Sequence, residues 1–175
     1  SLLATYETGA LPDNLAFSPD GRYLLTANEG EPSDDYSIDP EGGFTLIDLS
    51  SGPQDATVTQ IAVTGIDVPT GARIIKPEQS FAADAEPEYV AFSADGTMAY
   101  ATLQENNAIA LIDIAAKKVT NIVGLGVKNV SRMSHDMSNK DDGINMRRWP
   151  VLMMYQPDAL ATYEVNGATY LVTAN

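Results

Sequence analysis

The sequence contains no cysteine and only one histidine among its 175 residues. Without cysteine the chain has no disulfide, no thiolate nucleophile and no thiolate metal ligand, although this does not identify its compartment. A catalytic zinc centre draws on several histidine or cysteine ligands, so the lone His135 argues against zinc chemistry. No apolar run approaches the roughly 20 residues that span a bilayer. We expect any secretion signal to lie upstream of the first residue.

Positive charge is scarce as well, since 10 Lys and Arg residues stand against 24 Asp and Glu, for a net charge of −14. Nucleic acids and anionic membranes both require a basic footprint, so we expect neither as a partner. The charge is compatible with a divalent cation, with a basic partner, or with a merely solvated acidic surface. The hydrophobic content of 44% is sufficient for a folded core.

The chain does contain a strand–turn–strand unit that occurs three times, beginning at Pro12, Pro87 and Pro157. Each copy opens with proline and an acidic residue. Each then places Asp-Gly or Asn-Gly between two apolar runs, which is a strong hairpin signal. The segment FTLIDL at 44–49 is echoed by AIALIDI at 108–114, which indicates a third strand in each of the first two units. Such regular recurrence is typical of a repeat architecture.

These units predict an all-β fold, a partial β-propeller with about two and three-quarter four-stranded blades of a longer propeller. The blade units are roughly 12–64, 87–125 and 157–175, so residues 1–175 form a fragment of one β-propeller domain. We also expect a short strand at 2–8. Exposed blade edges would allow self-association. A small open β-sheet domain or a sandwich is the alternative fold.

The connections between the expected strands divide by length. Three long segments, at 29–43, 65–86 and 126–156, alternate with short turns. In an antiparallel blade the loop between the second and third strands shares an end with the loop leading to the next blade. We therefore expect all three long segments at one end, where binding residues are commonly held by a rigid scaffold. Alternatively, long loops merely cap the blades.

The loop at 29–43 is the leading candidate for a metal site. No Lys or Arg occurs between Arg22 and Arg73, and crowded carboxylates repel one another. Ca²⁺ would relieve this repulsion, because it accepts six to eight oxygen ligands in flexible geometry. The spacing matches no strict calcium template, and a solvated acidic loop is the alternative. The candidate ligands are Glu29, Glu31, Asp34, Asp35, Asp39 and Glu41.

Other polar residues are candidates for ligand binding. Asp13, Glu88 and Asp158 each precede a first strand, so they either line a central funnel for a cation or substrate or cap strand-entry amides. His135 beside Asp136 is interpreted as a loop contact rather than a general base. The segment 138–143 fails as an EF-hand, since Lys140 would fill a ligand position. The apolar segment 149–155 is expected to anchor a loop onto a blade, with a ligand-stacking patch as the alternative.

Several short motifs together resemble the choice-of-anchor I family, and the resemblance covers nearly the whole chain. Its members are secreted or surface-anchored propeller proteins, often labelled mesenchyme-specific cell-surface glycoprotein-like or alkaline phosphatase. The resemblance implies about seven blades, a parent chain continuing past Asn175, and extracytoplasmic placement: secreted, periplasmic or at the cell surface. The loop at 140–145 also resembles one of the family. The motifs are LPDN (11–14), ANEGEP (27–32), DDY (34–36), DPEG (39–42), EPEY (86–89), LQENNA (103–108) and YQPDA (155–159).

Two functions remain open at this stage. The first is a non-catalytic module that binds an unidentified ligand or cell-surface partner, with Ca²⁺ organising the acidic loop. The second is a calcium-dependent phosphoesterase, in which clustered acids hold Ca²⁺ ions that bridge phosphate and activate water. No Gly-x-Ser-x-Gly motif supports a hydrolase triad. In the second hypothesis the phosphate would be bound by Arg73, Lys76, Arg147 and Arg148.

Overall fold

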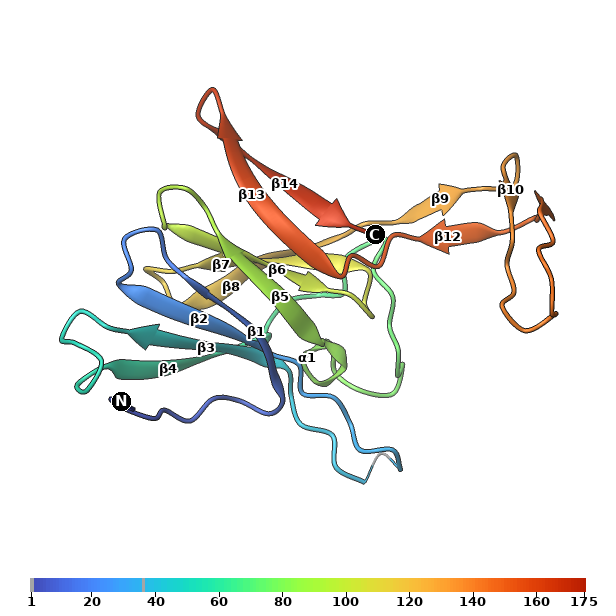
Figure 1. Ribbon diagram of the computed structural model, residues 1–175. Coiled ribbons are helices and arrows are strands. Elements are labelled where there is room, and N and C mark those ends of the chain that lie inside the picture. The colour runs from blue at the N-terminus through green and yellow to red at the C-terminus, as the bar shows by residue number, and fades with distance from the viewer. Residues whose placement is uncertain (1, 36) are drawn as a thin grey trace.

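The chain folds mainly into antiparallel β-sheet in the computed structural model, which describes residues 2–35 and 37–175 (Figure 1). Two four-stranded sheets come from consecutive parts of the chain, and each has its strands in chain order. The first sheet contains β1 (Pro12–Phe17), β2 (Tyr23–Asn28), β3 (Gly43–Asp48) and β4 (Thr57–Ala62). The second contains β5 (Pro87–Phe92), β6 (Met98–Leu103), β7 (Ala108–Asp113) and β8 (Lys118–Gly124).

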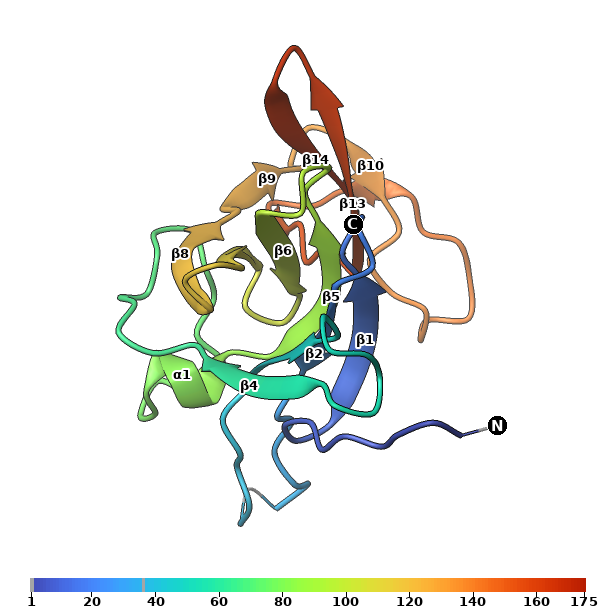
Figure 2. The same ribbon diagram turned by 90° about the vertical axis from the view of Figure 1, so that its left-hand side faces the viewer.

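A third sheet consists of two strands, β13 (Ala159–Val165) and β14 (Ala168–Ala174). The first strands of the three sheets, β1, β5 and β13, lie side by side (Figures 1 and 2). Meandering antiparallel sheets arranged in this way are the blades of a β-propeller. The prediction of an all-β, partial-propeller fold is therefore confirmed. The described residues include no helix long and apolar enough to cross a membrane.

The same turn joins the first two strands of both four-stranded blades. In the first blade Asp20 Oδ1 accepts hydrogen bonds from Ser18 Oγ at 2.6 Å and from the Arg22 N–H at 3.0 Å. Gly21 follows the acid with a φ of 71°, a left-handed conformation that glycine adopts without steric cost. The second blade repeats these contacts with Ser93, Asp95, Gly96 and Thr97. The Asp-Gly signal in the sequence therefore encodes the same turn twice.

The two four-stranded blades share one apolar core. Its largest fully buried side chains come from the middle strands of each blade, where both faces are covered: Leu25, Phe44, Leu46, Leu103 and Ile112. This burial explains why those strands are apolar without strict alternation. Polar contacts also join neighbouring blades. Asn14 Oδ1 accepts from the Val90 N–H at 3.1 Å, and Thr162 Oγ1 donates to the Phe92 carbonyl at 2.6 Å.

The long connections all leave the blades at one end, as predicted, and the β1–β2, β3–β4, β5–β6, β7–β8 and β13–β14 turns lie at the other (Figure 1). This long-loop end carries residues 29–42, 63–86 and 125–158 together with the β6–β7 turn. The middle connection includes the short helix α1 (Phe81–Asp84), which the sequence did not predict. Ser80 caps it, since its hydroxyl accepts a hydrogen bond from the Ala83 N–H.

Two buried asparagines in the β6–β7 turn hold these connections in place. Asn106 donates to the Asp84 carbonyl at 2.8 Å and accepts from the Glu86 N–H at 3.1 Å. Asn107 donates to the carbonyls of Gly71 and Gly126, at 3.0 and 2.7 Å. Its Oδ1 also accepts from the backbone N–H groups at 155 and 156. One turn thus ties both ends of the connection that follows the second blade, at residues 126 and 155–156, to the connection that precedes it.

One expectation about local structure was wrong, since residues 2–8 form no strand. The segment 149–155 is held to the second blade at its last residue, where the Tyr155 N–H donates to Asn107 Oδ1 at 2.9 Å. The rest of it lies away from the blades, because β12 (Leu152–Met154) pairs with β9 (Val127–Asn129) and its side chains are exposed. Farther out, β10 (Ser134–His135) pairs with β11 (Arg147–Arg148). We call residues 127–155 the arm, since they project from the blades (Figure 1).

Replacing Asn107 with alanine should lower the free energy of unfolding by about 3 kcal/mol, because it leaves buried backbone groups without partners. Chemical denaturation of the variant and the wild type measures this difference. Asn121→Ala, on the exposed surface of β8, is the matched control and should change stability by less than about 0.5 kcal/mol. Equal stability of the two variants would contradict the role assigned to Asn107.

Candidate functional site

The hollows of the surface gather at the long-loop end. One of about 390 Å³ lies between the end of β4 and α1, where Glu41 and Phe81 contribute to its lining. Another, of about 200 Å³, lies where β2, β3 and β4 meet the acidic loop. A small one is lined by Asp39, Lys76 and Glu86. The functional face expected from the loop lengths is therefore also the recessed face of the described structure.

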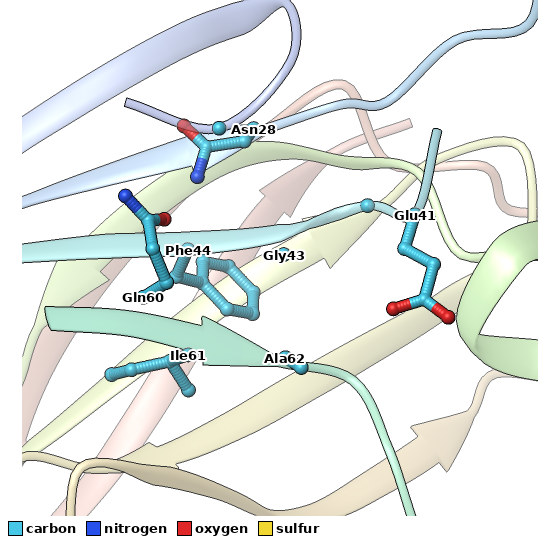
Figure 3. A pocket seen from close by; sticks show the side chains of 9 residues that line it. Asn28, Glu41, Gly43, Phe44, Gln60, Ile61 and Ala62 are labelled. Carbon is cyan, nitrogen blue, oxygen red and sulfur yellow. The ribbon is translucent and has the colours of Figure 1, made fainter. Parts of the chain in front are cut away.

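Figure 3 shows the second of these pockets, lined by residues including Asn28, Glu41, Phe44 and Gln60. Its amides are already engaged, because Asn28 Nδ2 donates to Thr45 Oγ1 at 2.9 Å and that hydroxyl donates to Gln60 Oε1 at 2.8 Å. The Glu41 side chain lies apart from them, on the side of α1 (Figure 3). The pocket therefore offers one carboxylate and an apolar floor.

The structure separates the acids of the 29–43 loop. Asp35 accepts from the hydroxyls of Ser33 and Ser37 at 2.9 and 2.7 Å, and these bonds lower its pKa to about 2. Asp39 pairs with Lys76 Nζ at 3.2 Å and also accepts from Gln79 Nε2. Asp34 is exposed. Among the residues described, no three acidic or histidine side chains are placed to hold one metal ion as they stand.

Glu29 and Glu31 instead belong to a second group of acids, which we call the axial carboxylates because they surround the ends of the first strands. Asp13 and Glu88 occupy equivalent positions at the start of β1 and β5, each beside an irregularity in strand register. The group as a whole comprises Asp13, Glu29, Glu31, Glu86, Glu88, Glu105 and Asp158, whose charges act on one another.

Burial and neighbouring charge disfavour the ionisation of three of the axial carboxylates, Glu29, Glu86 and Glu88. Burial, followed by the charges of Glu29 and Asp13, raises the pKa of Glu88 to about 8. Burial and then the charges of Glu105 and Glu29 raise the pKa of Glu86 to about 7. Burial and the charge of Glu31 raise the pKa of Glu29 as well. Negative charge is therefore concentrated here beyond what the surrounding protein neutralises.

Gln104 lies directly against the most buried of these acids. When its amide nitrogen faces Glu88, it donates to both carboxylate oxygens at 3.3 Å. When Glu88 is protonated, the amide oxygen can accept from it instead. A single amide that serves either protonation state allows Glu88 to titrate without a change in packing.

The predicted basic ligands do not meet these acids in one pocket. Arg73 pairs with Glu105 at 3.0 Å, which is its one contact with an axial carboxylate. Lys76 is paired with Asp39. Arg147 lies 3.8 Å from the centre of the Trp149 ring, and both it and Arg148 belong to β11 on the arm. The four residues are therefore divided between the loop edge and the arm.

Sequence reasoning identified five of the axial carboxylates but missed Glu86 and Glu105. Both lie within the motifs EPEY (86–89) and LQENNA (103–108), although neither was selected as a candidate ligand. Glu105 is the second residue after the end of β6, and Glu29 is the first residue after the end of β2. Comparison of the residues after each second strand would have revealed Glu105.

Fold and site together define a propeller-type domain with an acidic, recessed end. The family model for the choice-of-anchor I domain matches residues 1–175, and the chain therefore belongs to the choice-of-anchor I family. This confirms the resemblance seen in the sequence motifs. No curated protein compared with the chain matches it.

Solved structures similar to this chain are distant. A periplasmic gluconolactonase of Pseudomonas aeruginosa is 16% identical with a TM-score of 0.44, over 93% of this chain and 36% of its own. The Kuenenia stuttgartiensis hydrazine synthase is 17% identical with a TM-score of 0.43, over 99% and 49%. The β-propeller domain of Cps50 (Swd1) from Myceliophteria thermophila is 13% identical with a TM-score of 0.33, over 78% and 58%. The chain thus spans only part of each structure.

The raised pKa values of Glu86 and Glu88 predict that stability falls as the pH rises. Between the ordinary glutamate value of 4.5 and about 8, the folded state holds protons that the unfolded state has released. The contribution of these two protonated carboxyl groups to the free energy of unfolding is complete below about pH 4.5 and is lost as the pH rises past 7 to 8.

Thermal unfolding between pH 5 and 8.5 measures this dependence. Glu88→Gln should reduce the slope by about half, since it removes the more strongly shifted group. Glu164→Gln, on the exposed hairpin of β13, should leave the slope unchanged. A wild-type melting temperature that stays constant or rises over this range would contradict the assignment.

Proposed function

We propose that this chain is a non-catalytic, extracytoplasmic binding module whose axial carboxylates hold a divalent cation, Ca²⁺, on the long-loop end. The observation that carries the proposal is the crowding of Glu29, Glu86 and Glu88, whose pKa values are all raised. A bound cation would relieve the repulsion that otherwise favours their protonation. Membership of the choice-of-anchor I family supports placement outside the cytoplasm.

The chemistry of the donors fits a hard cation. Every axial ligand is a carboxylate, and Ca²⁺ takes six to eight oxygens with water filling open positions. Water is required here, because the acids do not converge on one point as they stand. Asp35 and Asp39 already have protein partners, so we place the ion on the Glu29 and Glu31 side of the loop.

The arrangement of the basic residues supports a ligand-binding module rather than a phosphoesterase. A phosphoesterase would bring Arg or Lys side chains beside the metal to hold the phosphate. Here Arg73 and Lys76 are paired with carboxylates, and the arginines of β11 lie on the arm. The calcium-dependent phosphoesterase remains the second candidate, supported by the acidic cluster and by the single Arg73–Glu105 contact.

Adhesion or ligand capture is the function this end of the domain would serve. A cation held at the rim of a recess can be coordinated by an oxygen of a partner molecule as well as by the protein. The partner would therefore be an oxygen-rich or acidic group presented at a surface, recognised through the ion.

Calcium should raise the melting temperature at pH 8. At 100 times its dissociation constant a single bound ion adds about 2.7 kcal/mol to the free energy of unfolding. Differential scanning calorimetry with and without CaCl₂ measures the shift, and titration calorimetry gives the affinity. Glu29→Gln and Glu88→Gln should each weaken binding about tenfold or more, because each removes one charged donor.

Asp34→Asn serves as the matched control, since Asp34 is an exposed acid of the same loop outside the axial group. Its calcium affinity should equal that of the wild type. A melting temperature unaffected by calcium, or equal losses in all three variants, would contradict the proposed position of the ion.

Hydrolysis of p-nitrophenyl phosphate tests the second candidate. We expect no turnover above that of a chelator-treated sample, because Arg73 is paired with Glu105, Lys76 is paired with Asp39, and the arginines of β11 lie on the arm, so the four do not meet in one pocket. Calcium-dependent turnover that is lost in Glu88→Gln would instead establish the phosphoesterase.

A further inference from the structure

The arm differs in chemistry from the rest of the protein. It carries five basic residues and three acidic ones, whereas the whole chain has a net charge of −14. Five of the six methionines also lie on it, at positions 133, 137, 146, 153 and 154. The arm is therefore a basic and methionine-rich segment of an acidic protein, and its chemistry suits a different ligand from that of the axial carboxylates.

A pocket of about 210 Å³ lies at the base of the arm, beside Asn175, the residue that follows β14. It is formed where the β9–β12 ribbon meets β10, so its walls come from both parts of the arm. Its lining is mostly apolar, with one cationic and one imidazole side chain. The residues are Lys128, Val130, His135, Met153, Met154, Tyr155 and Asn175.

His135 brings an unsatisfied polar atom to this pocket. Its Nε2 is the one buried side-chain nitrogen or oxygen, among residues 2–35 and 37–175, that has no hydrogen-bond partner. The backbone of His135 is fixed, because its carbonyl accepts from Trp149 Nε1 at 2.9 Å and its strand pairs with Arg147. Solvent does not reach the nitrogen in this conformation, so a group seated in the pocket satisfies it only after the imidazole ring turns toward that group.

The lining selects the charge of such a ligand. A cation would be repelled by Lys128, and a hydrocarbon would leave the imidazole nitrogen without a partner. Once the ring has turned, an anion can accept a hydrogen bond from an Nε2–H group and be attracted by the Lys128 ammonium at the same time. Val130 is almost fully buried and, with the methionines, offers an apolar wall to the remainder of the ligand.

We propose that this pocket binds a small organic anion, a carboxylate with an apolar body, through His135 and Lys128. The site is separate from the axial carboxylates and involves none of their residues. Its ligand has the opposite charge to the cation proposed there, so the two sites take different molecules and failure of one leaves the other unaffected.

Benzoate is the probe, with neutral benzamide and cationic benzylamine as matched compounds of the same shape. Because the chain has a single histidine, its imidazole nitrogen resonances are assigned without ambiguity. Titration with benzoate should shift the Nε2 resonance in a saturable way. Benzamide should bind at least about threefold more weakly, and benzylamine should produce no saturable shift.

Two variants test the residues. His135→Phe keeps an aromatic ring and should weaken benzoate binding about tenfold, measured by titration calorimetry. Lys128→Met keeps the apolar stem but removes the charge, and should weaken it about threefold. Lys140→Met removes an exposed charge elsewhere on the arm and should leave the affinity unchanged. Because Lys128 lies on an exposed strand, we expect Lys128→Met to fold, and this variant still tests the site if His135→Phe fails to fold.

Three results would overturn the proposal. The first is the absence of saturable benzoate binding, which would mean that the pocket holds only water. The second is equal affinity for benzoate and benzylamine. The third is saturable binding of Ag⁺, seen as shifts of the His135 and methionine resonances, with a higher affinity in Lys128→Met than in the wild type. That result would identify a site for a soft metal ion instead.

Discussion

Antiparallel pairing within each blade is the constraint on which the functional end depends. Each hairpin reverses the chain, so successive connections alternate between the two ends of a four-stranded blade. The connection between the second and third strands and the connection to the next blade must then leave from the same end. In this protein those connections are the three long ones and the short β6–β7 turn, and they bring residues such as Glu29, Glu86 and Glu105 together although they lie far apart in the sequence.

Charge at that end is set by how the few basic residues are used. Arg22 pairs with Asp48 at 2.9 Å in the first blade, and Lys76 pairs with Asp39 on the outer loop. Arg73 pairs with an axial acid, Glu105. The remaining axial carboxylates are left to repel one another in a partly buried setting, where such repulsion is little screened by salt. A share of the excess negative charge therefore lies at the long-loop end, where it is partly buried.

Much of the fold follows from local signals, and the exceptions have physical causes. Asp-Gly turns between apolar runs define β1–β2 and β5–β6, since short hydrogen bonds such as Ser18–Asp20 make these turns independent of distant residues. The arm strands were missed because they are two or three residues long and exposed, so no buried face imposes a pattern on them. The short helix α1 was missed for a similar reason, because it is four residues long and its cap provides most of its local signal.

The sequence by itself determined the all-β architecture, the family and the end of the blades to which the long loops belong, because strand periodicity, turn chemistry and loop length are all written in neighbouring residues. It also marked Asp13 and Glu88 by their repeated position after proline. Only the tertiary structure decided which acids act together. Asp35 and Asp39 lie in the same loop as Glu29 but have their own partners, since Asp35 accepts hydrogen bonds from nearby serine hydroxyls and Asp39 is paired with Lys76 of a distant segment. Electrostatic interaction depends on distance and burial in space, and neither quantity is encoded in the spacing of carboxylates along a loop.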